Sequence, residues 1–161
     1  MDISIRPATA DDAFAACAAM RRSIAECCSL DHNNDQAVVD AWLKNKTADN
    51  TRALIQGPEN FCVVAIVHGA VAGFGMARAG KVLLCYAVPE VHRQGAGKSM
   101  LQAMEARAVA SGAITMRLES TRTALAFYTR NGYVPVGAAV NIFGMEGQPM
   151  AKSLATVAAA R

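Results

Sequence analysis

The first third of the chain shows a helical pattern of apolar positions after one short strand. Residues 3–5 alternate isoleucine with serine shortly before a proline, which predicts a strand. Residues 13–28 are strong helix formers with apolar side chains at helical spacing, so we expect a long helix there. A polar break at residues 29–35 precedes a second predicted helix at 38–43 and a short third one at 47–55.

The middle of the chain changes to the pattern of extended strands. Residues 61–67, 71–77 and 81–88 are rich in β-branched and other apolar residues. Two short turn sequences, His68-Gly69 and Ala79-Gly80, separate these segments. The simplest arrangement is a meander of three antiparallel strands.

The last third alternates helices and strands. Residues 98–110 predict a helix that ends at a serine-glycine pair, and residues 123–130 predict another that ends at an asparagine-glycine pair. Strand patterns at residues 114–118, 134–136 and 139–150 complete the predicted sheet. Helices and strands therefore follow one another up to the C-terminal part of the chain.

Together these elements predict a single domain of the α/β (α+β) class. We expect a mixed, mostly antiparallel sheet of about six to seven strands with helices on both faces. The chain has neither an internal repeat nor a low-complexity linker, and 161 residues suffice for one hydrophobic core. The domain is expected to cover residues 1–154, and residues 155–161 are expected to form a C-terminal tail.

Charge and composition exclude several classes of protein. A formal net charge of +3 is too mild for a nucleic-acid binder, which usually carries a basic stripe. No apolar run reaches the roughly 18 residues of a membrane span. The polar, acidic beginning of the chain differs from a signal peptide, so we expect a cytoplasmic protein.

The cysteines also argue against a metal site or a disulfide framework. Their number is odd, and they form neither a CxxC pair nor a Cys/His ligand pattern. We expect no metal, and reduced, mostly buried thiols. The five are Cys17, Cys27, Cys28, Cys62 and Cys85.

The most informative segment is the glycine loop between the strand at 81–88 and the helix at 98–110. Gly95 and Gly97 lack side chains, so backbone N–H groups can approach a bound anion. The helix that follows adds the unpaired N–H groups of its first turn. Arg93 and Lys98 add positive charge, so the loop is suited to a phosphate or pyrophosphate.

Three kinds of phosphate loop compete for this segment. A Walker A loop requires glycine where this chain has His92, and a dinucleotide fingerprint requires glycine where it has Met100. The third kind of phosphate loop matches the residues of this segment better. Residues 92–97 follow a strand that ends in proline, and they resemble the Q/R-x-x-G-x-G/A motif of the GNAT superfamily of N-acetyltransferases, with histidine at the Gln or Arg position.

A second element strengthens the resemblance. The helix at 123–130 carries the pair Phe127-Tyr128, and Gly132-Tyr133 follows at the turn into the next strand, as in a later motif of that family. An asparagine often found seven residues before the helical tyrosine is Thr121 in this chain. The resemblance covers nearly the whole chain, from the first predicted strand to the last.

The resemblance implies that an amine attacks acetyl-CoA directly within a ternary complex. The backbone amides of Tyr86, Ala87 and Val88 would hold the pantetheine arm, and Tyr128 would protonate or hydrogen-bond the departing thiolate. The cofactor-binding positions implied in this way are Tyr86, Ala87, Val88, Arg93, Gln94, Gly95, Ala96, Gly97, Lys98, Thr121 and Tyr128.

The general base and the acceptor are less defined. Some family members carry a glutamate where this chain has Lys81, so Glu119, Asp31, His32 or water remain as candidates for the base. The acceptor pocket is expected to be walled by residues of the first helices, with packing as the alternative for each: Cys28, Asp31, His32 and Trp42.

Several functions remain possible at this stage. The leading one is an enzyme that acetylates a primary amine, which could belong to a small molecule, an antibiotic, an amino acid or a protein terminus. A CoA-binding sensor or partner subunit without catalysis is the main rival, and a small NTPase is disfavoured by His92. The resemblance also suggests a homodimer. From charge and hydropathy we expect neither a nucleic-acid partner nor a membrane.

Overall fold

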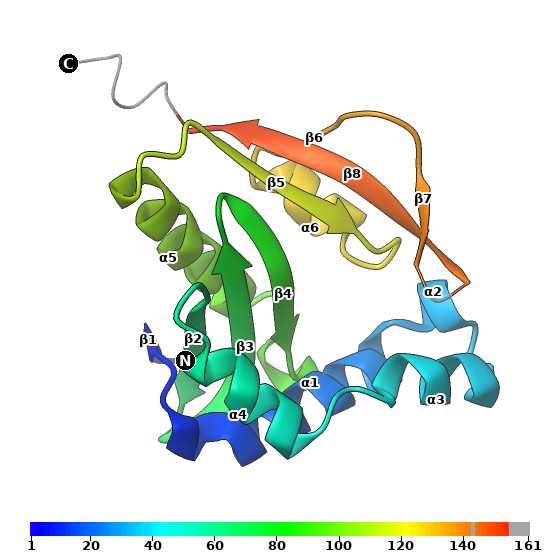
Figure 1. Ribbon diagram of the computed structural model, residues 1–161. Helices are drawn as coiled ribbons and strands as arrows, with labels where there is room; N and C mark the ends of the chain where they lie inside the picture. Colours follow the sequence, from blue (N-terminus) through cyan, green and yellow to red (C-terminus); the bar gives the residue numbers. More distant parts are fainter. Residues whose placement is uncertain (143, 155–161) are drawn as a thin grey trace.

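The computed structural model describes residues 1–142 and 144–154, and the expected tail at 155–161 lies outside the described residues. Eight strands form one open, mostly antiparallel sheet in the order β1-β2-β3-β4-β5-β8-β6, with β7 also paired to β8 (Figure 1). The strands are β1 (Ile3–Pro7), β2 (Phe61–Val67), β3 (Ala70–Arg78), β4 (Lys81–Ala87), β5 (Thr115–Ser120), β6 (Val134–Pro135), β7 (Val140–Ile142) and β8 (Met145–Ser153).

Helices cover both faces of this sheet, as the sequence predicts. The α-helices are α1 (Ala13–Cys27), α2 (Ser29–His32), α3 (Gln36–Leu43), α4 (Ala48–Gln56), α5 (Ala96–Ala110) and α6 (Leu125–Arg130), and the 3-10 turns are η1 (Ala10–Asp12) and η2 (Pro89–Val91). The expected α/β class, with a single mostly antiparallel sheet, is confirmed. Among the described residues, no helix is both long and apolar enough to cross a membrane.

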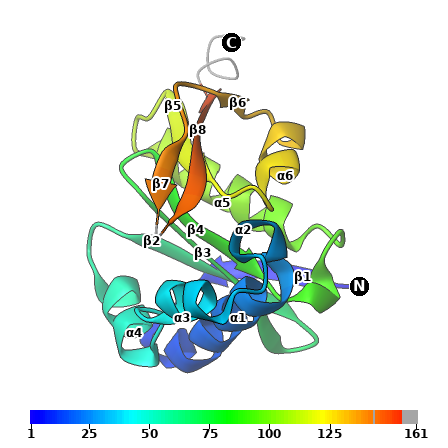
Figure 2. The same cartoon turned by 90° about the vertical axis from the view of Figure 1, so that its right-hand side faces the viewer.

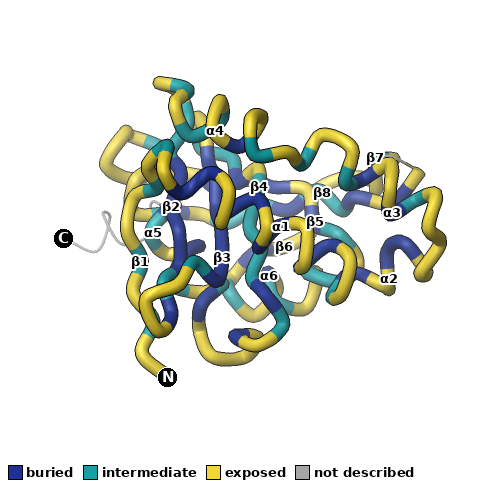
Figure 3. The backbone as a smooth tube through the Cα atoms, turned by 90° about the horizontal axis from the view of Figure 1, so that it is seen from below, coloured by how far each residue is buried: buried dark blue, intermediate teal, exposed yellow. Residues whose placement is uncertain are grey.

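The core lies on the two faces of β2 and β3, whose backbone is largely drawn as buried in Figure 3. Val63 and Ala65 of β2 pack with α5, whereas Cys62 and Val64 pack with α1 on the opposite face. Successive side chains of a strand point to opposite faces, so a strand covered on both sides needs apolar residues at every position. This explains why residues 61–67 form a continuous apolar run.

Both predicted turns of the meander are present. His68 and Gly69 have φ values of 51° and 76°, and Ala79 and Gly80 have 49° and 75°. Two consecutive left-handed residues match the twist of antiparallel strands, so each pair makes a tight hairpin.

Two segments differ from the sequence-based expectation. The polar break at 29–35 contains the short helix α2, whose His32 is 1% exposed because it packs against the end of α1. The segment 139–150, expected as one strand, instead forms the antiparallel pair β7 and β8. Asn141 Oδ1 accepts a hydrogen bond from the Gly144 amide at 3.0 Å, which is typical of an asparagine that stabilises a turn.

Candidate active site

The sheet opens between β4 and β5, which are the only parallel pair among the described strands. β4 and β5 share a single register position, Lys81 opposite Arg117, and then diverge. β4 continues to pair with β3 as far as Ala87. Its other edge therefore faces a wedge between β4 and β5 instead of a neighbouring strand.

Only alternate amides of β4 face this wedge. Val88 donates its N–H to Ala72 O at 2.9 Å, so its amide belongs to the β3 side. Because N–H groups alternate along a strand, Tyr86 also faces β3, whereas Ala87 and Cys85 face the wedge. The expectation that Tyr86, Ala87 and Val88 all offer amides is thus corrected: among these three, Ala87 alone presents its backbone to the opening.

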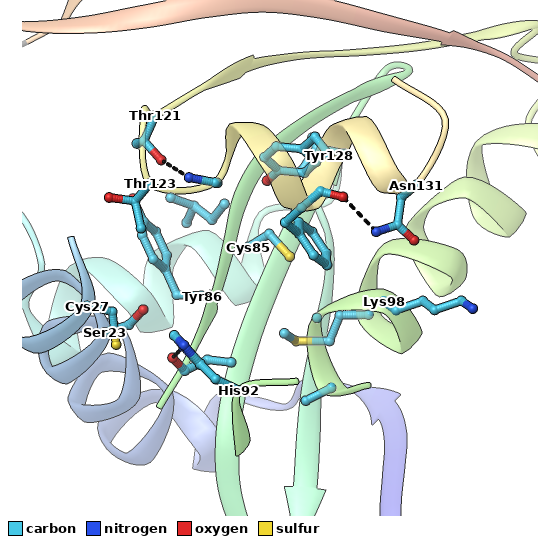
Figure 4. Close-up of a pocket in the computed structure, with 18 of the residues that line it drawn as sticks. Ser23, Cys27, Cys85, Tyr86, His92, Lys98, Thr121, Thr123, Tyr128 and Asn131 are labelled. Carbon is cyan, nitrogen blue, oxygen red and sulfur yellow. Dashed lines mark hydrogen bonds between the residues drawn. The ribbon is translucent and has the colours of Figure 1, made fainter. Parts of the chain in front are cut away.

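A cavity of about 680 Å³ occupies the wedge. Its walls come from the end of α1, from β4, from the glycine loop and α5, and from the end of β5 with α6 (Figure 4). The expected site residues that line it are Cys28, Tyr86, Ala87, Arg93, Gly95, Ala96, Gly97, Lys98, Glu119, Thr121 and Tyr128.

The glycine loop presents a concave row of N–H groups to the cavity. Arg93 and Gly95 have left-handed φ values of 63° and 92°. Ser99 N donates to Gly95 O at 2.9 Å, which is the first hydrogen bond of the helix. The N–H groups of residues 96–98 therefore have no partner within the helix and point outward from its N-terminus. Such a helix end attracts anions. Gln94 does not line the cavity, and its amide is bonded to Val91 O at 3.2 Å.

The two glycines are needed for different reasons. Gly95 adopts its left-handed conformation with open space around it, so the conformation itself favours glycine. Gly97 is helical, and a Cβ there would lie 3.1 Å from Cζ of Phe127. Its small size therefore serves the contact between α5 and α6 as well as the approach to an anion.

Tyr128 places its ring deep in the wall formed by α6. It is 7% exposed, and its ring packs edge-to-face on Phe127 at 5.1 Å and on Tyr133 at 5.7 Å between ring centroids. Burial, with the nearby Cys85, raises the pKa of the Tyr128 hydroxyl well above its ordinary value. Tyr128 is therefore a neutral phenol across the physiological range and can donate a hydrogen bond.

The neighbouring tyrosine and cysteines have no such role. Tyr133 is 1% exposed and donates its hydroxyl to Glu105 Oε2 at 2.7 Å, so it is a core residue with a satisfied hydroxyl. Burial raises the pKa values of Cys85 and Cys28 to about 12. Because the thiolate is the nucleophile, neither thiol is activated for covalent catalysis.

Glu119 lies at the cavity and is held by an ion pair. Its Oε1 accepts from Lys81 Nζ at 3.0 Å, and both side chains are about one-third exposed. The lysine that replaces the family's glutamate thus binds the alternative carboxylate. Thr121 Oγ1 accepts from the Ala124 amide at 3.2 Å, which stabilises the turn into α6.

Three residues of the first helices do not line this cavity. Asp31 accepts hydrogen bonds from Arg122 and Thr123, and both ring nitrogens of His32 are bonded to backbone. Trp42 is 4% exposed and packs with Ile24 and other core residues. The acceptor wall expected from Asp31, His32 and Trp42 is thus corrected, because their polar atoms and rings are engaged behind the cavity.

The cavity also includes residues outside the set that the sequence predicted for the site. His92 donates Nε2–H to Ala87 O at 3.0 Å and thereby braces the end of β4 against the glycine loop. Ser23 lines the cavity from α1, and Arg130 and Asn131 line it from the end of α6. The sequence signal for Arg130 is its position two residues after Tyr128, on a helix predicted to belong to the site. Within the described parts of the chain, no cluster of three or more His, Cys, Asp or Glu is arranged for a metal ion.

Comparisons with known proteins agree with this geometry. Residues 29–154 match the family model described as the acetyltransferase (GNAT) domain. No curated protein sequence matches the chain. The family match over residues 29–154 covers more than half of the chain, so it extends well beyond the glycine loop.

Three solved structures show the same fold. A GCN5-related N-acetyltransferase from Rhodopseudomonas palustris superposes with a TM-score of 0.85 at 24% identity, over 96% of this chain and 97% of the other. The PaiA N-acetyltransferase of Thermoplasma acidophilum, in complex with coenzyme A, has a TM-score of 0.79 at 20% identity, over 95% and 99%. The ribosomal-protein-S18-alanine N-acetyltransferase of Escherichia coli has 0.68 at 18%, over 95% and 94%. With the family match over residues 29–154, these observations identify the chain as a member of the GNAT acetyltransferase family.

Proposed function

We propose that this protein transfers an acetyl group from acetyl-CoA to a primary amine by direct attack within a ternary complex. The observation that carries the proposal is a single cavity shared by three features: the open edge of β4, the N–H row of the glycine loop, and Tyr128. The edge of β4 would bind an extended amide-containing arm, and the N–H row would bind phosphate. Tyr128 would donate a hydrogen bond to a leaving group.

The residues present are well suited to coenzyme A. The amides of residues 96–98, with Arg93, Lys98 and Arg130 on the cavity wall, would bind its pyrophosphate and phosphate groups. The backbone of Cys85 and Ala87 would pair with its pantetheine arm as a strand pairs with a sheet edge. When bound, acetyl-CoA supplies a thioester carbonyl that a neutral amine can attack.

Tyr128 would stabilise the leaving thiolate chiefly by a hydrogen bond. A free thiol has a pKa of about 8.5 and a free phenol one of about 10. Burial raises the pKa of Tyr128 further, so complete proton transfer from this phenol to a thiolate is unfavourable. A hydrogen bond in a buried site still stabilises developing charge, and the proton reaches the sulfur later from solvent.

The base that deprotonates the amine is either Glu119 or water. Glu119 lies at the cavity, but its Oε1 is bound to Lys81, so Oε2 would have to accept the proton. If Glu119 acts as the base, Glu119→Gln lowers kcat. If water acts as the base, the variant keeps the kcat of the wild type.

The first experiment is a calorimetric titration of the protein with acetyl-CoA, with ATP and NAD as controls. We expect selective micromolar binding of acetyl-CoA. An acceptor screen by thiol release would then compare a small alkyl amine, an amino acid, an aminoglycoside and a peptide with an N-terminal alanine. A protein that binds ATP in preference, or fails to bind acetyl-CoA, contradicts the proposal.

A CoA-binding module without catalysis is the second candidate. The observation in its favour is Lys81, which occupies the position of the family glutamate and pairs with Glu119. Such a module would bind acetyl-CoA with no thiol release above the uncatalysed rate for any amine in the screen. The cytoplasmic location and the homodimer stay predictions.

A further inference from the structure

Asp31 ties two distant parts of the chain together. It lies in α2, is 9% exposed, and accepts hydrogen bonds from groups more than ninety positions later in the sequence. Oδ1 accepts from the Arg122 amide at 2.7 Å, and Oδ2 accepts from the Thr123 amide at 3.2 Å and the Thr123 hydroxyl at 2.5 Å. Both oxygens of this buried carboxylate are thus directed at the loop between β5 and α6.

The helix that carries Asp31 is itself firmly held. His32 accepts from the Asn34 amide through Nδ1 at 3.1 Å and donates Nε2–H to Ile24 O, on α1, at 2.8 Å. Its ring also packs edge-to-face on Trp42 at 6.2 Å. These contacts fix the ring tautomer and anchor α2 on α1, so Asp31 presents its oxygens from a rigid support.

The loop that Asp31 holds leads directly into the helix of Tyr128. α6 has six residues, and its N-cap Ala124 makes no side-chain capping bond. A helix this short is not stable on its own, so tertiary contacts must set its position. The Tyr128 amide donates to Ala124 O at 3.0 Å, one helical turn after Ala124, which follows Thr123 directly. Figure 2 shows the loop that leads from β5 into α6 passing next to α2, in agreement with the hydrogen bonds from this loop to Asp31.

We propose that Asp31 is a positioning residue that holds the start of α6 so that the Tyr128 hydroxyl faces the sulfur of the leaving group. The proposal rests on the acetyltransferase function proposed above. It replaces the acceptor-binding role that the sequence suggested for Asp31. Since the carboxylate is engaged by three donors, Asp31 acts through the loop and never touches the substrate.

The kinetic test compares Asp31→Asn in two backgrounds, wild type and Tyr128→Phe. The probes are acetyl-CoA and the best amine of the acceptor screen, measured by thiol release. In the wild-type background we expect kcat to fall about 10-fold, because a small displacement of a catalytic group is costly. The KM for acetyl-CoA should change less than about 2-fold, since the glycine loop is untouched.

In the Tyr128→Phe background the same substitution should have almost no further effect on kcat. Two residues that act through one another are not additive. Equal losses in both backgrounds would show that Asp31 supports the fold in general and would overturn the proposal. Thr123→Val, which removes one of the three donors, is the milder second variant and should lower kcat about 3-fold.

The matched control is Glu146→Gln. Glu146 pairs with the Arg122 side chain at 2.7 Å on the same loop, but both side chains are largely exposed. An exposed ion pair contributes little, so kcat should remain within about 2-fold of wild type. A loss as large as that of Asp31→Asn would assign the effect to any disturbance of the loop and would contradict a specific role for Asp31.

Hydrogen exchange of the free protein separates this proposal from the proposed function. Asp31→Asn should raise the exchange rates of amides in residues 122–130 and leave those of α5 unchanged. We expect this change in exchange rates even if no amine is acetylated. In that case the proposed acetyltransferase function is wrong, while Asp31 still holds the start of α6. Unchanged exchange in residues 122–130 would overturn the positioning role whatever the activity.

Discussion

The hydroxyl of Tyr128 lies among aromatic rings and the Cys85 thiol, where a phenolate is strongly disfavoured. At the residue scale, this environment keeps Tyr128 protonated, so its hydroxyl acts as a hydrogen-bond donor. The same environment makes Cys85 inert, because burial raises its pKa to about 12. One buried site therefore suits hydrogen-bond donation and not covalent catalysis.

Replacing Tyr128 by phenylalanine should slow turnover without abolishing it. The variant loses the hydrogen bond to the leaving thiolate, and we expect kcat to fall about 10- to 100-fold. The shape of the kcat profile should be unchanged below about pH 10, since the raised pKa keeps Tyr128 protonated there. Steady-state thiol-release assays across this range provide the measurement.

Tyr133→Phe is the control for that prediction. It removes the same atom from a tyrosine whose hydroxyl is bonded to Glu105, away from the reaction. It should reduce stability and leave kcat within about 2-fold of wild type. An unchanged kcat in Tyr128→Phe would exclude a role of its hydroxyl in leaving-group departure.

At the scale of elements, the predicted helices and strands recur because their signals are local. The 61–67 run, the two turns with glycine and the helix at 98–110 each depend on neighbours within a few residues. α2 was missed because three of its four residues are polar, its one apolar side chain (Leu30) is exposed, and its stability comes from contacts of His32 with α1. Such contacts leave no periodic pattern in the sequence.

The joint between β1 and α1 allows a test at this scale. Arg6 binds both oxygens of Asp12 at 2.7 and 2.9 Å, and the Thr9 amide adds a bond at 2.8 Å. The hydrogen bonds of Arg6 lead the causes that lower the pKa of Asp12 to about 2. Asp12→Asn should lower the free energy of unfolding at pH 7 by about 1–2 kcal/mol. The loss is modest because Arg6 is partly exposed and solvent screens its charge.

The pH dependence of this loss has a definite sign. A depressed pKa stabilises the folded state above the ordinary value near 3.8, and the contribution disappears as pH falls toward 2. The difference in denaturation midpoint between wild type and Asp12→Asn should therefore shrink from pH 5 to pH 2. Asp11→Asn, at an exposed neighbouring position, should show no such difference; a gap that persists at pH 2 would refute the ionic explanation.

At the scale of the whole molecule, the cavity joins α1, β4, α5, β5 and α6, so a ligand there links elements across the sheet. Acetyl-CoA at 100 times its dissociation constant should stabilise the fold by about 2.7 kcal/mol. For a domain of this size, this corresponds to a rise in Tm of about 5–10 °C. Differential scanning calorimetry with and without acetyl-CoA measures it.

Gly97→Trp supplies the matching negative control. Its side chain would strike Phe127 and close the space before the amides of residues 96–98. The variant's own Tm should be lower, and acetyl-CoA should no longer raise it. ATP should leave the Tm of wild type unchanged. A full shift in Gly97→Trp would place the phosphate site elsewhere.

The sequence by itself determined the class of the domain, its glycine loop, the helix of Tyr128 and the likeness to one family, because each depends on residue type at fixed local spacing. Tertiary structure decided which amides of β4 are open, where Glu119 finds its partner, and which polar residues face the cavity. These depend on how strands diverge and which distant groups meet. Asp31 is the clearest case: its carboxylate was available in the sequence, but only folding brought Thr123 to it.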